Sequence, residues 1–511
     1  MPATTLTPPN RSECGEPRDV KLRRLAAACL LLLPWLNACS PSGPPATEAA
    51  GLERPAFTAC RIEHVDSPAQ CVQLEVPADH AVPDGAKLKI HVALIPSLAR
   101  RKAPDPVVLL AGGPGQAASD LGRLVQALHI LRRSRDIVLV DQRGTGKTNT
   151  LGCAPLDTLK REDWDDLRRL DEAFVQREWK QCLATLRGDP RVHRTDDYVA
   201  DLESVRKALG IRQWNLWGGS YGSRVALRYL KRHPEAIRTA VLDGVAPTAV
   251  QIPEDLLAES SALLDRAFAD CAASPSCNAA HPDLAARYER LIERLARTPL
   301  KIRETHPATG EPLEFWLDDR VLTLLLWPLL YTPETVRLIP QILAQVENGR
   351  VAPLLAVAFD GPIDPGRIGV LMRFAVLCAE DMARSPGRAV PARFAAAAAQ
   401  FRAACEGLPV KPVAAEFFEP TRSEVPTLLL SGSHDPVTPP AYAAEAGKTL
   451  TRHRHLVVEG MGHIVSHHPC LTRVIARFIE QGDHPSEPLT CEAELKLPLP
   501  HFFVSPRIAA P

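Results

Sequence analysis

Five residues near the middle of the chain, from Gly218 to Gly222, read Gly-Gly-Ser-Tyr-Gly and place a serine between small neighbours. An apolar run at 214–217, typical of a strand, precedes them, and a helical pattern at 224–233 follows. A serine on such a strand-to-helix turn is strained and exposed, and the amides of the helix point at developing negative charge. The pattern predicts Ser220 as a nucleophile, and the alternative is a tight turn with an idle serine.

A serine hydroxyl needs a histidine to take its proton, and the histidine needs a carboxylate to fix its tautomer. Asp435 follows an apolar run at 428–430, and His463 follows another at 456–458. Either residue alone would be read as a loop cap or a surface histidine. Their order after the serine, each behind a predicted strand, is the order found in one fold of serine hydrolases. We therefore predict a catalytic triad of Ser220, Asp435 and His463.

Acyl transfer also needs hydrogen-bond donors for the oxyanion, and a glycine-rich segment offers one. The residues from Ala111 to Gly115 follow the predicted strand at 107–110, where the same fold supplies one of its two amides. We predict the backbone amides of Gly113 and Tyr221 as the donors, with Pro114 in a cis bond that shapes the turn. The alternative is an ordinary Gly-Pro turn.

Two rival chemistries fit less well. The run from Gly144 to Thr148 resembles the end of a phosphate-binding loop, but the full motif requires a further glycine where Asp141 stands. His463 and His467 have the spacing of metal ligands, but no carboxylate or cysteine completes a site. We therefore expect neither nucleotide hydrolysis nor a metal, and no cofactor. His434, His467 and His468 are interpreted as loop and helix-end residues.

Apolar runs along the chain predict the strands that must hold these residues. The runs at 107–110 and 137–140 are apolar throughout, as in strands buried on both faces of a parallel sheet. The runs at 71–76 and 88–95 alternate, as in half-buried strands of an antiparallel edge. Further strands are expected at 214–217, 240–243, 426–430 and 455–458, with helices at 119–132, 195–210, 224–233 and 472–481. The alternation predicts an α/β fold, with a mostly parallel sheet flanked by helices.

The stretch 247–424 interrupts this alternation and is interpreted as an inserted helical cap. Its helices are expected at 255–271, 282–297, 321–330, 333–347 and 391–405. With 511 residues, the chain is long enough for one large domain with such an insertion. The predicted organisation is a signal peptide at 1–39, a linker at 40–55, a core at 56–246 and 425–511, and the cap between the two core parts.

The first forty residues predict export. Basic residues at 21–24 precede an apolar run at 25–36 of about a dozen residues, short of the roughly 20 that a spanning helix needs. The residues before Cys39 resemble a bacterial lipobox, in which Asn37 is unusual, and predict lipid on Cys39. The protein is then a periplasmic lipoprotein, or else a secreted protein. Lys plus Arg equals Asp plus Glu, at 60 each, so the net charge gives no reason to expect nucleic acid as a partner.

The cysteine count suits an oxidising compartment. Removing Cys14, Cys29 and Cys39 from the thirteen cysteines leaves ten, an even number that favours disulfides. Many pairings are open. Neighbours along the chain suggest Cys60 with Cys71, Cys153 with Cys182, Cys271 with Cys277, Cys378 with Cys405, and Cys470 with Cys491.

Taken together, five blocks of sequence resemble the prolyl aminopeptidase and tripeptidyl aminopeptidase group of α/β hydrolases. The blocks stand in the family's order at 112–115, 141–144, 218–222, 435–439 and 462–463. The family's first block often begins with histidine, and Ala111 occupies that place here. The segment 470–491 is similar to the C-terminal region of the exported tripeptidyl aminopeptidase branch, which supports the disulfide between Cys470 and Cys491.

The resemblance implies an α/β-hydrolase fold and removal of prolyl, dipeptidyl or tripeptidyl units from peptides with a free N-terminus. Acidic groups near the cap would bind the ammonium group of the substrate, and a similar block at 376–381 points to Glu380 and Asp381. The alternatives are an esterase or amidase with the same triad, and a binding protein with a relict site. The oligomeric state stays open.

Overall fold

The structure is a computed structural model and describes residues 55–148, 151–157, 172–307, 309–359, 368–384, 389–484, 495 and 502–503. The chain divides into two units, Met1–Leu52 and Glu53–Pro511, and all described residues belong to the second. The expected signal peptide and Cys39 lie outside the described residues, so they stay predictions. Within the described residues, no helix has the length and apolarity that a membrane crossing requires.

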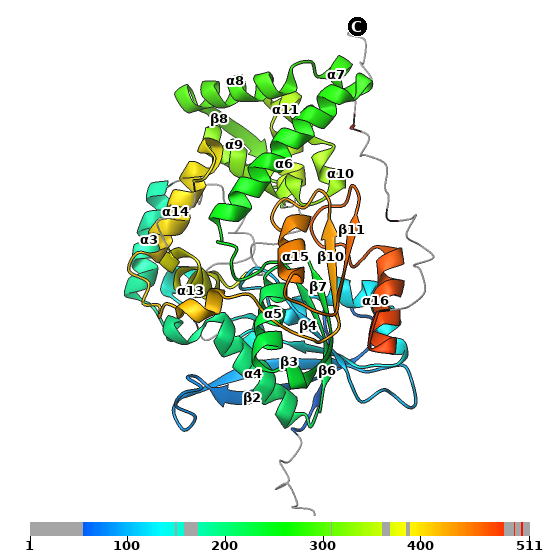
Figure 1. Cartoon of the computed structure of the whole chain (residues 1–511). Helices are drawn as coiled ribbons and strands as arrows, with labels where there is room; N and C mark the ends of the chain where they lie inside the picture. The colour runs from blue at the N-terminus through cyan, green and yellow to red at the C-terminus, as the bar shows by residue number, and fades with distance from the viewer. Residues whose placement is uncertain are drawn as a thin grey trace, which may run out of the picture. The chain divides into compact units, whose positions relative to one another are not determined.

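A nine-stranded sheet forms the centre of the described part of the chain (Figure 1). Its order is β1-β2-β3-β5-β4-β6-β7-β10-β11. The first three strands run antiparallel to their neighbours, and the six from β5 to β11 are parallel. The strands are β1 (Thr58–Cys60), β2 (Ala69–Pro77), β3 (Lys87–Ile95), β4 (Val107–Leu110), β5 (Ile137–Val140), β6 (Trp214–Gly219), β7 (Ile237–Asp243), β10 (Thr427–Gly432) and β11 (His453–Val458). The predicted antiparallel edge and parallel centre are both confirmed.

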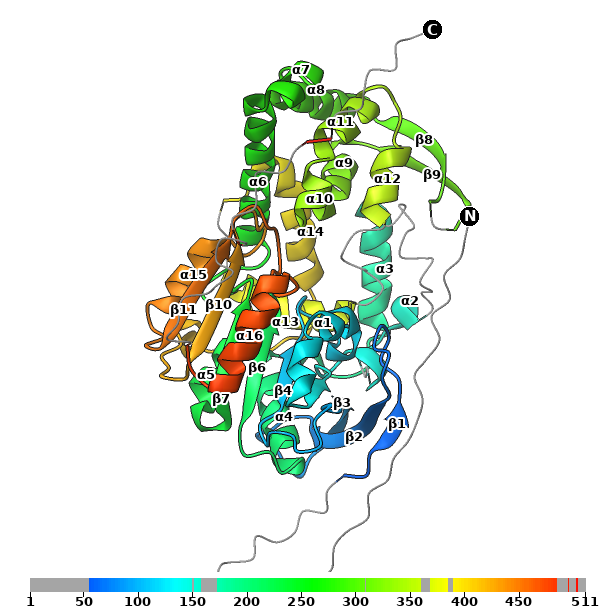
Figure 2. The ribbon, with the colours of Figure 1, turned by 90° about the vertical axis from the view of Figure 1, so that its right-hand side faces the viewer.

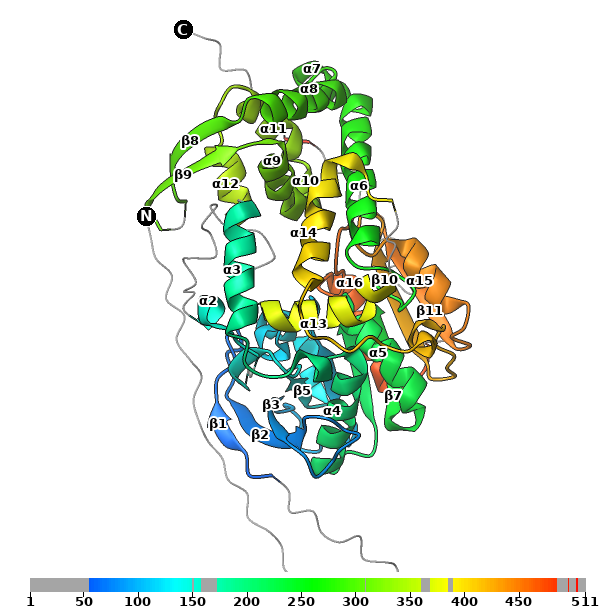
Figure 3. The same ribbon diagram turned by 90° about the vertical axis from the view of Figure 1, so that its left-hand side faces the viewer.

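Helices cover both faces of the sheet, as the fully apolar central strands require. Val108 and Leu110 of β4 pack in a cluster with residues of α4 (Thr195–Ala208) and α5 (Tyr221–Arg232), the face seen in Figure 3. Val107 and Leu109 point the other way, into a cluster with α1 (Gly122–Ala127) and α16 (Pro469–Gln481), the face seen in Figure 2. One strand therefore supplies both cores through its two-residue period.

The residues between β7 and β10, where the sequence predicts an inserted cap, have a hydrophobic cluster of their own. The helices of this insertion are α6 (Glu254–Ala273), α7 (Pro275–Ala280), α8 (Leu284–Arg297), α9 (Asp319–Leu326), α10 (Pro333–Val336), α11 (Ile339–Glu347), α12 (Ala352–Phe359), α13 (Val370–Glu380) and α14 (Ala395–Cys405). The sequence predicted a helical insertion, but the insertion also contains an antiparallel hairpin formed by β8 (Leu300–Thr305) and β9 (Pro312–Leu317). Only Ile302, Phe315 and Leu317 of these strands are buried, so their apolar signal is weak.

Other differences concern where helices begin and break. The helix expected at 119–132 is broken into α1 and two short 3-10 turns, and the one at 333–347 is split into α10 and α11. The helix expected from Arg224 begins at Tyr221, directly after Ser220. Six of the described helices were not expected: α2 (Ala154–Asp157), α3 (Glu172–Ala184), α7, α12, α13 and α15 (Pro440–Gly447).

Four of the five suggested disulfides are present: Cys60–Cys71, Cys153–Cys182, Cys271–Cys277 and Cys378–Cys405. Cys470 is also disulfide-bonded, while Cys491 lies outside the described residues. The first two disulfides lie in the core, the third lies within the cap, and the fourth joins α13 to the end of α14.

Candidate active site

The strand β6 ends in a sharp turn that presents Ser220. This residue has φ 55° and ψ −126°, a backbone conformation that is rare outside glycine and strained for a serine. The N–H of Ser220 donates to the carbonyl of Asp243 at 2.9 Å, which ties the turn to the end of β7. The Ser220 side chain is only partly buried. The predicted strand-to-helix context of Ser220 is therefore present.

The glycines on either side of this turn are required by close backbone contacts. A β-carbon at Gly222 would lie 2.1 Å from the carbonyl oxygen of Leu110, and one at Gly218 would lie 2.4 Å from the carbonyl oxygen of Gly222. Backbone cannot move aside as a flexible side chain can. The spacing of the motif thus follows from packing α5 directly against β4 and β6.

Asp435 and His463 are brought together by the parallel strands β10 and β11. Each residue follows the carboxyl end of its strand, and the Nδ1 atom of His463 lies 2.8 Å from Oδ2 of Asp435. The other carboxylate oxygen, Oδ1, accepts the backbone N–H groups of Val437 and Thr438 at 2.9 and 2.8 Å. The aspartate is therefore held from two sides with its charge directed at the imidazole.

Asp435 and His463 each shift the pKa of the other toward its charged form. Burial alone would lower the pKa of His463, but the charge of Asp435 and the hydrogen bond to it outweigh burial, and the pKa is raised. Burial alone would raise the pKa of Asp435, but the charge and hydrogen bond of His463, with the two backbone amides, bring that pKa below its ordinary value. An imidazole with a raised pKa and a fixed tautomer is suited to take a proton from a nearby hydroxyl.

A second buried aspartate, Asp243, holds both halves of the site. Its carbonyl accepts the Ser220 N–H, while its carboxylate accepts the N–H groups of Val465 at 3.0 Å and Ser466 at 2.7 Å. Between His463 and these residues lies Ile464 with φ 65°, a rare conformation for a β-branched residue. The sequence did not predict this role, although Asp243 ends an apolar run just as the predicted triad residues follow theirs.

Of the two predicted oxyanion donors, Tyr221 directly follows Ser220 in the chain, and Gly113 is next to Gly112, which lies against Ser220. Tyr221 is the first residue of α5, so its N–H has no partner within the helix. The Gly113–Pro114 bond is cis, as expected. A β-carbon at neighbouring Gly112 would lie 3.7 Å from the Oγ atom of Ser220, so this loop lies against the nucleophile.

Two hydrogen bonds hold the side chain of Tyr221 in place. Its hydroxyl accepts a hydrogen bond from Nε2 of Gln142 at 3.0 Å and is bonded to Oγ1 of Thr195 at 2.8 Å. Burial raises the pKa of Tyr221 far above its ordinary value, so the phenol stays neutral. Gln142 follows the end of β5, and Thr195 is the first residue of α4. Two further core elements therefore position Tyr221 beside Ser220.

Two parts of the sequence match known protein families. Residues 105–290 match a family model described as alpha/beta hydrolase fold, and residues 390–491 match one described as TAP-like protein. The chain has the α/β-hydrolase fold.

Relatives of this α/β hydrolase include peptidases. Serine protease Hip1 of Mycobacterium tuberculosis H37Rv is 25% identical over 476 residues, which cover 85% of this chain and 90% of that protein. Proline iminopeptidase of Neisseria gonorrhoeae is 33% identical over 144 residues, 28% of this chain and 34% of that protein. A crystal structure of proline iminopeptidase from Mycobacterium smegmatis aligns with a TM-score of 0.36 and 16% identity, over 81% of this chain and 99% of that one. The sequence relatives and the family models support a serine hydrolase or peptidase.

The two acids expected to bind an ammonium group are enclosed in the hydrolase. Glu380 and Asp381 are fully buried at the end of α13. Glu380 accepts the N–H and Oγ–H of Thr195 at 2.6 and 2.9 Å, and Asp381 accepts Nη1 of Arg224 at 3.0 Å. Burial raises the pKa of Glu380 to about 8, which the charge of Arg224 only partly offsets. The two acids therefore join the cap to α4 and α5, and an ammonium group would compete with Arg224 for Asp381.

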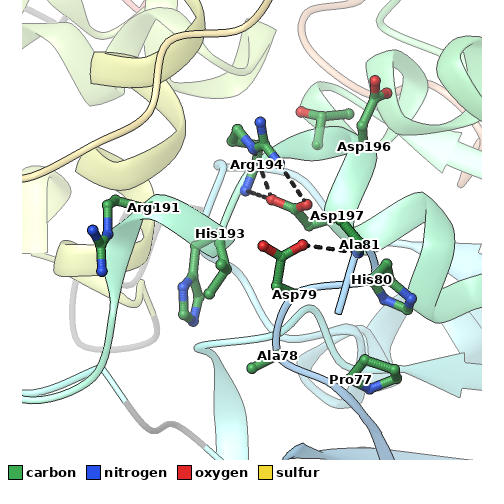
Figure 4. Close-up of polar contacts among 12 residues, drawn as sticks. Pro77, Ala78, Asp79, His80, Ala81, Arg191, His193, Arg194, Asp196 and Asp197 are labelled. Atoms are coloured by element: carbon green, nitrogen blue, oxygen red, sulfur yellow. Dashed lines mark hydrogen bonds and ion pairs between the residues drawn. The ribbon is translucent and has the colours of Figure 1, made fainter. Parts of the chain in front are cut away.

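The block at 141–144 has a structural role in the hydrolase. Arg143 is buried and donates to Asp201 of α4 at 2.7 Å, to the carbonyl of Ala78 at 2.7 Å, and to that of Val192 at 2.6 Å. Figure 4 shows the segment around Ala78 beside the turn that carries His193. One guanidinium thus joins the end of β2, the turn before α4 and the end of β5, which also carries Gln142.

The cap contacts the candidate base His463 directly through Tyr331. The N–H of His463 donates to the carbonyl of Tyr331 at 2.9 Å, and the two rings meet edge to face with centroids 5.5 Å apart. A β-carbon at Gly462 would lie 2.2 Å from that same carbonyl oxygen. The position of His463 therefore depends on the cap as well as on the sheet.

Proposed function

We propose that this serine hydrolase is an exported aminopeptidase that acts through Ser220, His463 and Asp435. The observation that carries the proposal is the 2.8 Å bond between His463 and Asp435, on loops adjacent to the strained turn of Ser220. The carbonyl and carboxylate of Asp243 connect the turn of the serine to the loop of the histidine, which supports a common site.

In the first step, Oγ of Ser220 attacks the carbonyl carbon of the scissile bond while Nε2 of His463 takes the hydroxyl proton. The N–H groups of Gly113 and Tyr221 hold the negative oxygen of the tetrahedral intermediate. As the intermediate collapses, His463 gives its proton to the leaving amine. Water then attacks the acyl-enzyme, His463 takes a proton from it and returns that proton to Ser220, and the acid is released.

The proposed substrates are peptides with a free N-terminus, from which prolyl, dipeptidyl or tripeptidyl units are removed. The TAP-like match at 390–491 and the peptidase names of the relatives support this substrate class. Binding of the substrate's ammonium group by Glu380 and Asp381 stays part of the proposal. It requires the group to reach two carboxylates that Thr195 and Arg224 now occupy.

That enclosure favours the second candidate, an esterase or amidase on non-peptide substrates. Such an enzyme uses the same triad but needs no carboxylate beside the substrate's amine. The two candidates therefore differ in the dependence of hydrolysis on a free amino group.

Export is proposed on the cysteines and the N-terminal pattern. The four disulfides between described cysteines are typical of oxidising compartments. Lipid on Cys39 would attach the protein to a membrane surface and leave the catalytic unit in the periplasm; without it the protein is secreted.

The deciding experiment is hydrolysis of a chromogenic panel by the wild type and Ser220→Ala. The panel contains prolyl, alanyl and tripeptidyl amides with free amines, their N-blocked counterparts, and short-chain esters. We expect cleavage of the free-amine amides by the wild type alone. Cleavage restricted to esters and blocked amides would instead support the esterase, and equal activity in Ser220→Ala would contradict the nucleophile.

A further inference from the structure

Arg373 lies on the cap beside the loop at 111–115, which carries the proposed oxyanion donor Gly113 and is called the oxyanion loop below. It belongs to the first turn of α13, and its N–H donates to the carbonyl of Gly369 at 2.8 Å. Gly369 in turn donates to the carbonyl of Gly115 at 2.8 Å, and a β-carbon at Gly115 would lie 3.4 Å from Cβ of Arg373. The start of α13 is thus bonded to the loop whose residue Gly112 lies against Ser220.

The guanidinium of Arg373 has no acid partner among the described residues. Its Nε atom is fully buried and makes no hydrogen bond, although the side chain as a whole is only partly buried. The other described arginines at 368–405 are paired: Arg384 with Asp381, Arg393 with Asp265 and Glu289, and Arg402 with Glu254. Among the described residues, Arg373 therefore differs from these arginines in having no carboxylate partner.

Two aromatic side chains surround this charge. The guanidinium carbon lies 5.6 Å from the ring centroid of Phe401. Tyr331, whose ring meets that of His463, also acts on Arg373 electrostatically. Burial lowers the pKa of Arg373, and Tyr331 only partly offsets this. A partly desolvated cation without a counter-ion is costly to keep, and a ligand anion would remove that cost.

We propose that Arg373 binds a carboxylate of the substrate, beside the scissile bond that Ser220 attacks. The planar fork of a guanidinium matches a carboxylate with two parallel hydrogen bonds, and aromatic neighbours strengthen such a pair by excluding water. The carboxylate belongs either to an acidic side chain of the peptide or to its C-terminus, since both present the same group. The inference rests on the proposed function and adds the substrate chemistry that the cap selects.

The test is binding of matched peptides to the inactive Ser220→Ala protein, measured by calorimetry. The probes are tetra-alanine as free acid and as C-terminal amide, and tetra-alanine amides carrying Glu or Gln at each position in turn. We expect one acidic probe to bind about 10- to 100-fold more tightly than its neutral counterpart. Preference for the free acid identifies the terminal carboxylate, and preference for a Glu probe identifies a side chain.

Variants assign that preference to the residue. In Ser220→Ala combined with Arg373→Gln the difference between acidic and neutral probes should vanish, while neutral probes keep their affinity. Combined with Arg373→Lys, which keeps the charge but loses the fork, part of the difference should remain. Arg393→Gln, at a paired cap arginine outside the site, is the control and should keep the full preference. Absence of any acidic preference, or a preference that survives Arg373→Gln, overturns the inference.

Failure of the proposed function looks different. If peptides neither bind nor are cleaved while esters are, the enzyme is not a peptidase. The same comparison then uses p-nitrophenyl hemisuccinate and its neutral methyl ester in the wild type and in Arg373→Gln. A selective loss on the acidic ester supports the carboxylate site, and an equal effect on both esters contradicts it.

Discussion

At the scale of single residues, the site combines strain with carboxylates that hold it. Ser220 and Ile464 both have positive φ values, at 55° and 65°, and both are anchored on Asp243 or on the residues that Asp243 binds. A conformation that costs free energy persists only where neighbouring bonds fix it. We therefore expect Asp243 to act as a positioning residue for Ser220 and His463.

Replacing Asp243 by alanine tests that role. The N–H groups of Val465 and Ser466 would lose their buried acceptor, at roughly 1–3 kcal/mol, and the loop of His463 would be free to relax. We expect kcat to fall by about 10- to 100-fold with little change in KM. Asp243→Asn keeps one acceptor oxygen and should give an intermediate loss. Equal kcat values in the three proteins, measured on one chromogenic substrate, would contradict the role.

The pH dependence of hydrolysis should report the pairing of Asp435 with His463. The base must be neutral to accept the serine proton, so kcat/KM falls as pH drops through the raised pKa of His463. In Asp435→Asn the charge that raises this pKa is removed. The acid limb should then move to lower pH, and kcat/KM at neutral pH should fall by roughly three to four orders of magnitude because the tautomer is no longer fixed. An acid limb that does not move would show that another group titrates.

At the scale of elements, the α13 helix was not among the helices expected, yet it carries three groups that matter. Its start is bonded to the oxyanion loop, Arg373 follows, and its end holds Glu380 and Asp381 against α4 and α5. No local sequence pattern predicts these contacts of α13, because each partner is distant in the sequence. By contrast, β4 and β5 are predicted to the residue, since a strand buried on both faces is apolar at every position.

The junction of α13 with the core should make stability depend on pH. Glu380 has a folded-state pKa of about 8, raised chiefly by burial, against an ordinary value near 4.5. The folded protein thus holds this proton more tightly than the unfolded chain, so its stability is highest below the unfolded pKa and falls as pH rises toward 8. Glu380→Gln cannot ionise and should lose this fall, which we place at roughly 2–4 kcal/mol.

Thermal unfolding of the wild type and Glu380→Gln at pH 5 and pH 8 measures this difference. Glu416→Gln, at an exposed glutamate, is the control and should follow the wild type. A stability difference between wild type and Glu380→Gln that stays the same from pH 5 to pH 8 would show that Arg224 keeps the carboxylate ionised throughout.

At the scale of the whole molecule, strand order explains why the candidate triad was accessible from sequence while its surroundings were not. Parallel strands bring their carboxyl ends to one edge, so Ser220, Asp435 and His463 are predictable from three apolar runs and the residues after them. The contact of Tyr331 with His463 joins positions over a hundred residues apart and crosses from cap to core. Such contacts depend on how the insertion packs, which no local periodicity encodes.

The disulfides also stabilise the chain as a whole, because they restrict the unfolded state. Cys153–Cys182 closes a separation of 29 residues within the core, whereas Cys271–Cys277 closes one of 6 within the cap. Chain entropy in the unfolded state favours the longer loop, with about 3.6 kcal/mol expected against about 2.2. Removing the first pair as a double serine variant should therefore lower the free energy of unfolding by more than removing the second. Denaturant unfolding of both variants measures the two costs, and the reverse order would show that packing around the small cap disulfide outweighs loop length.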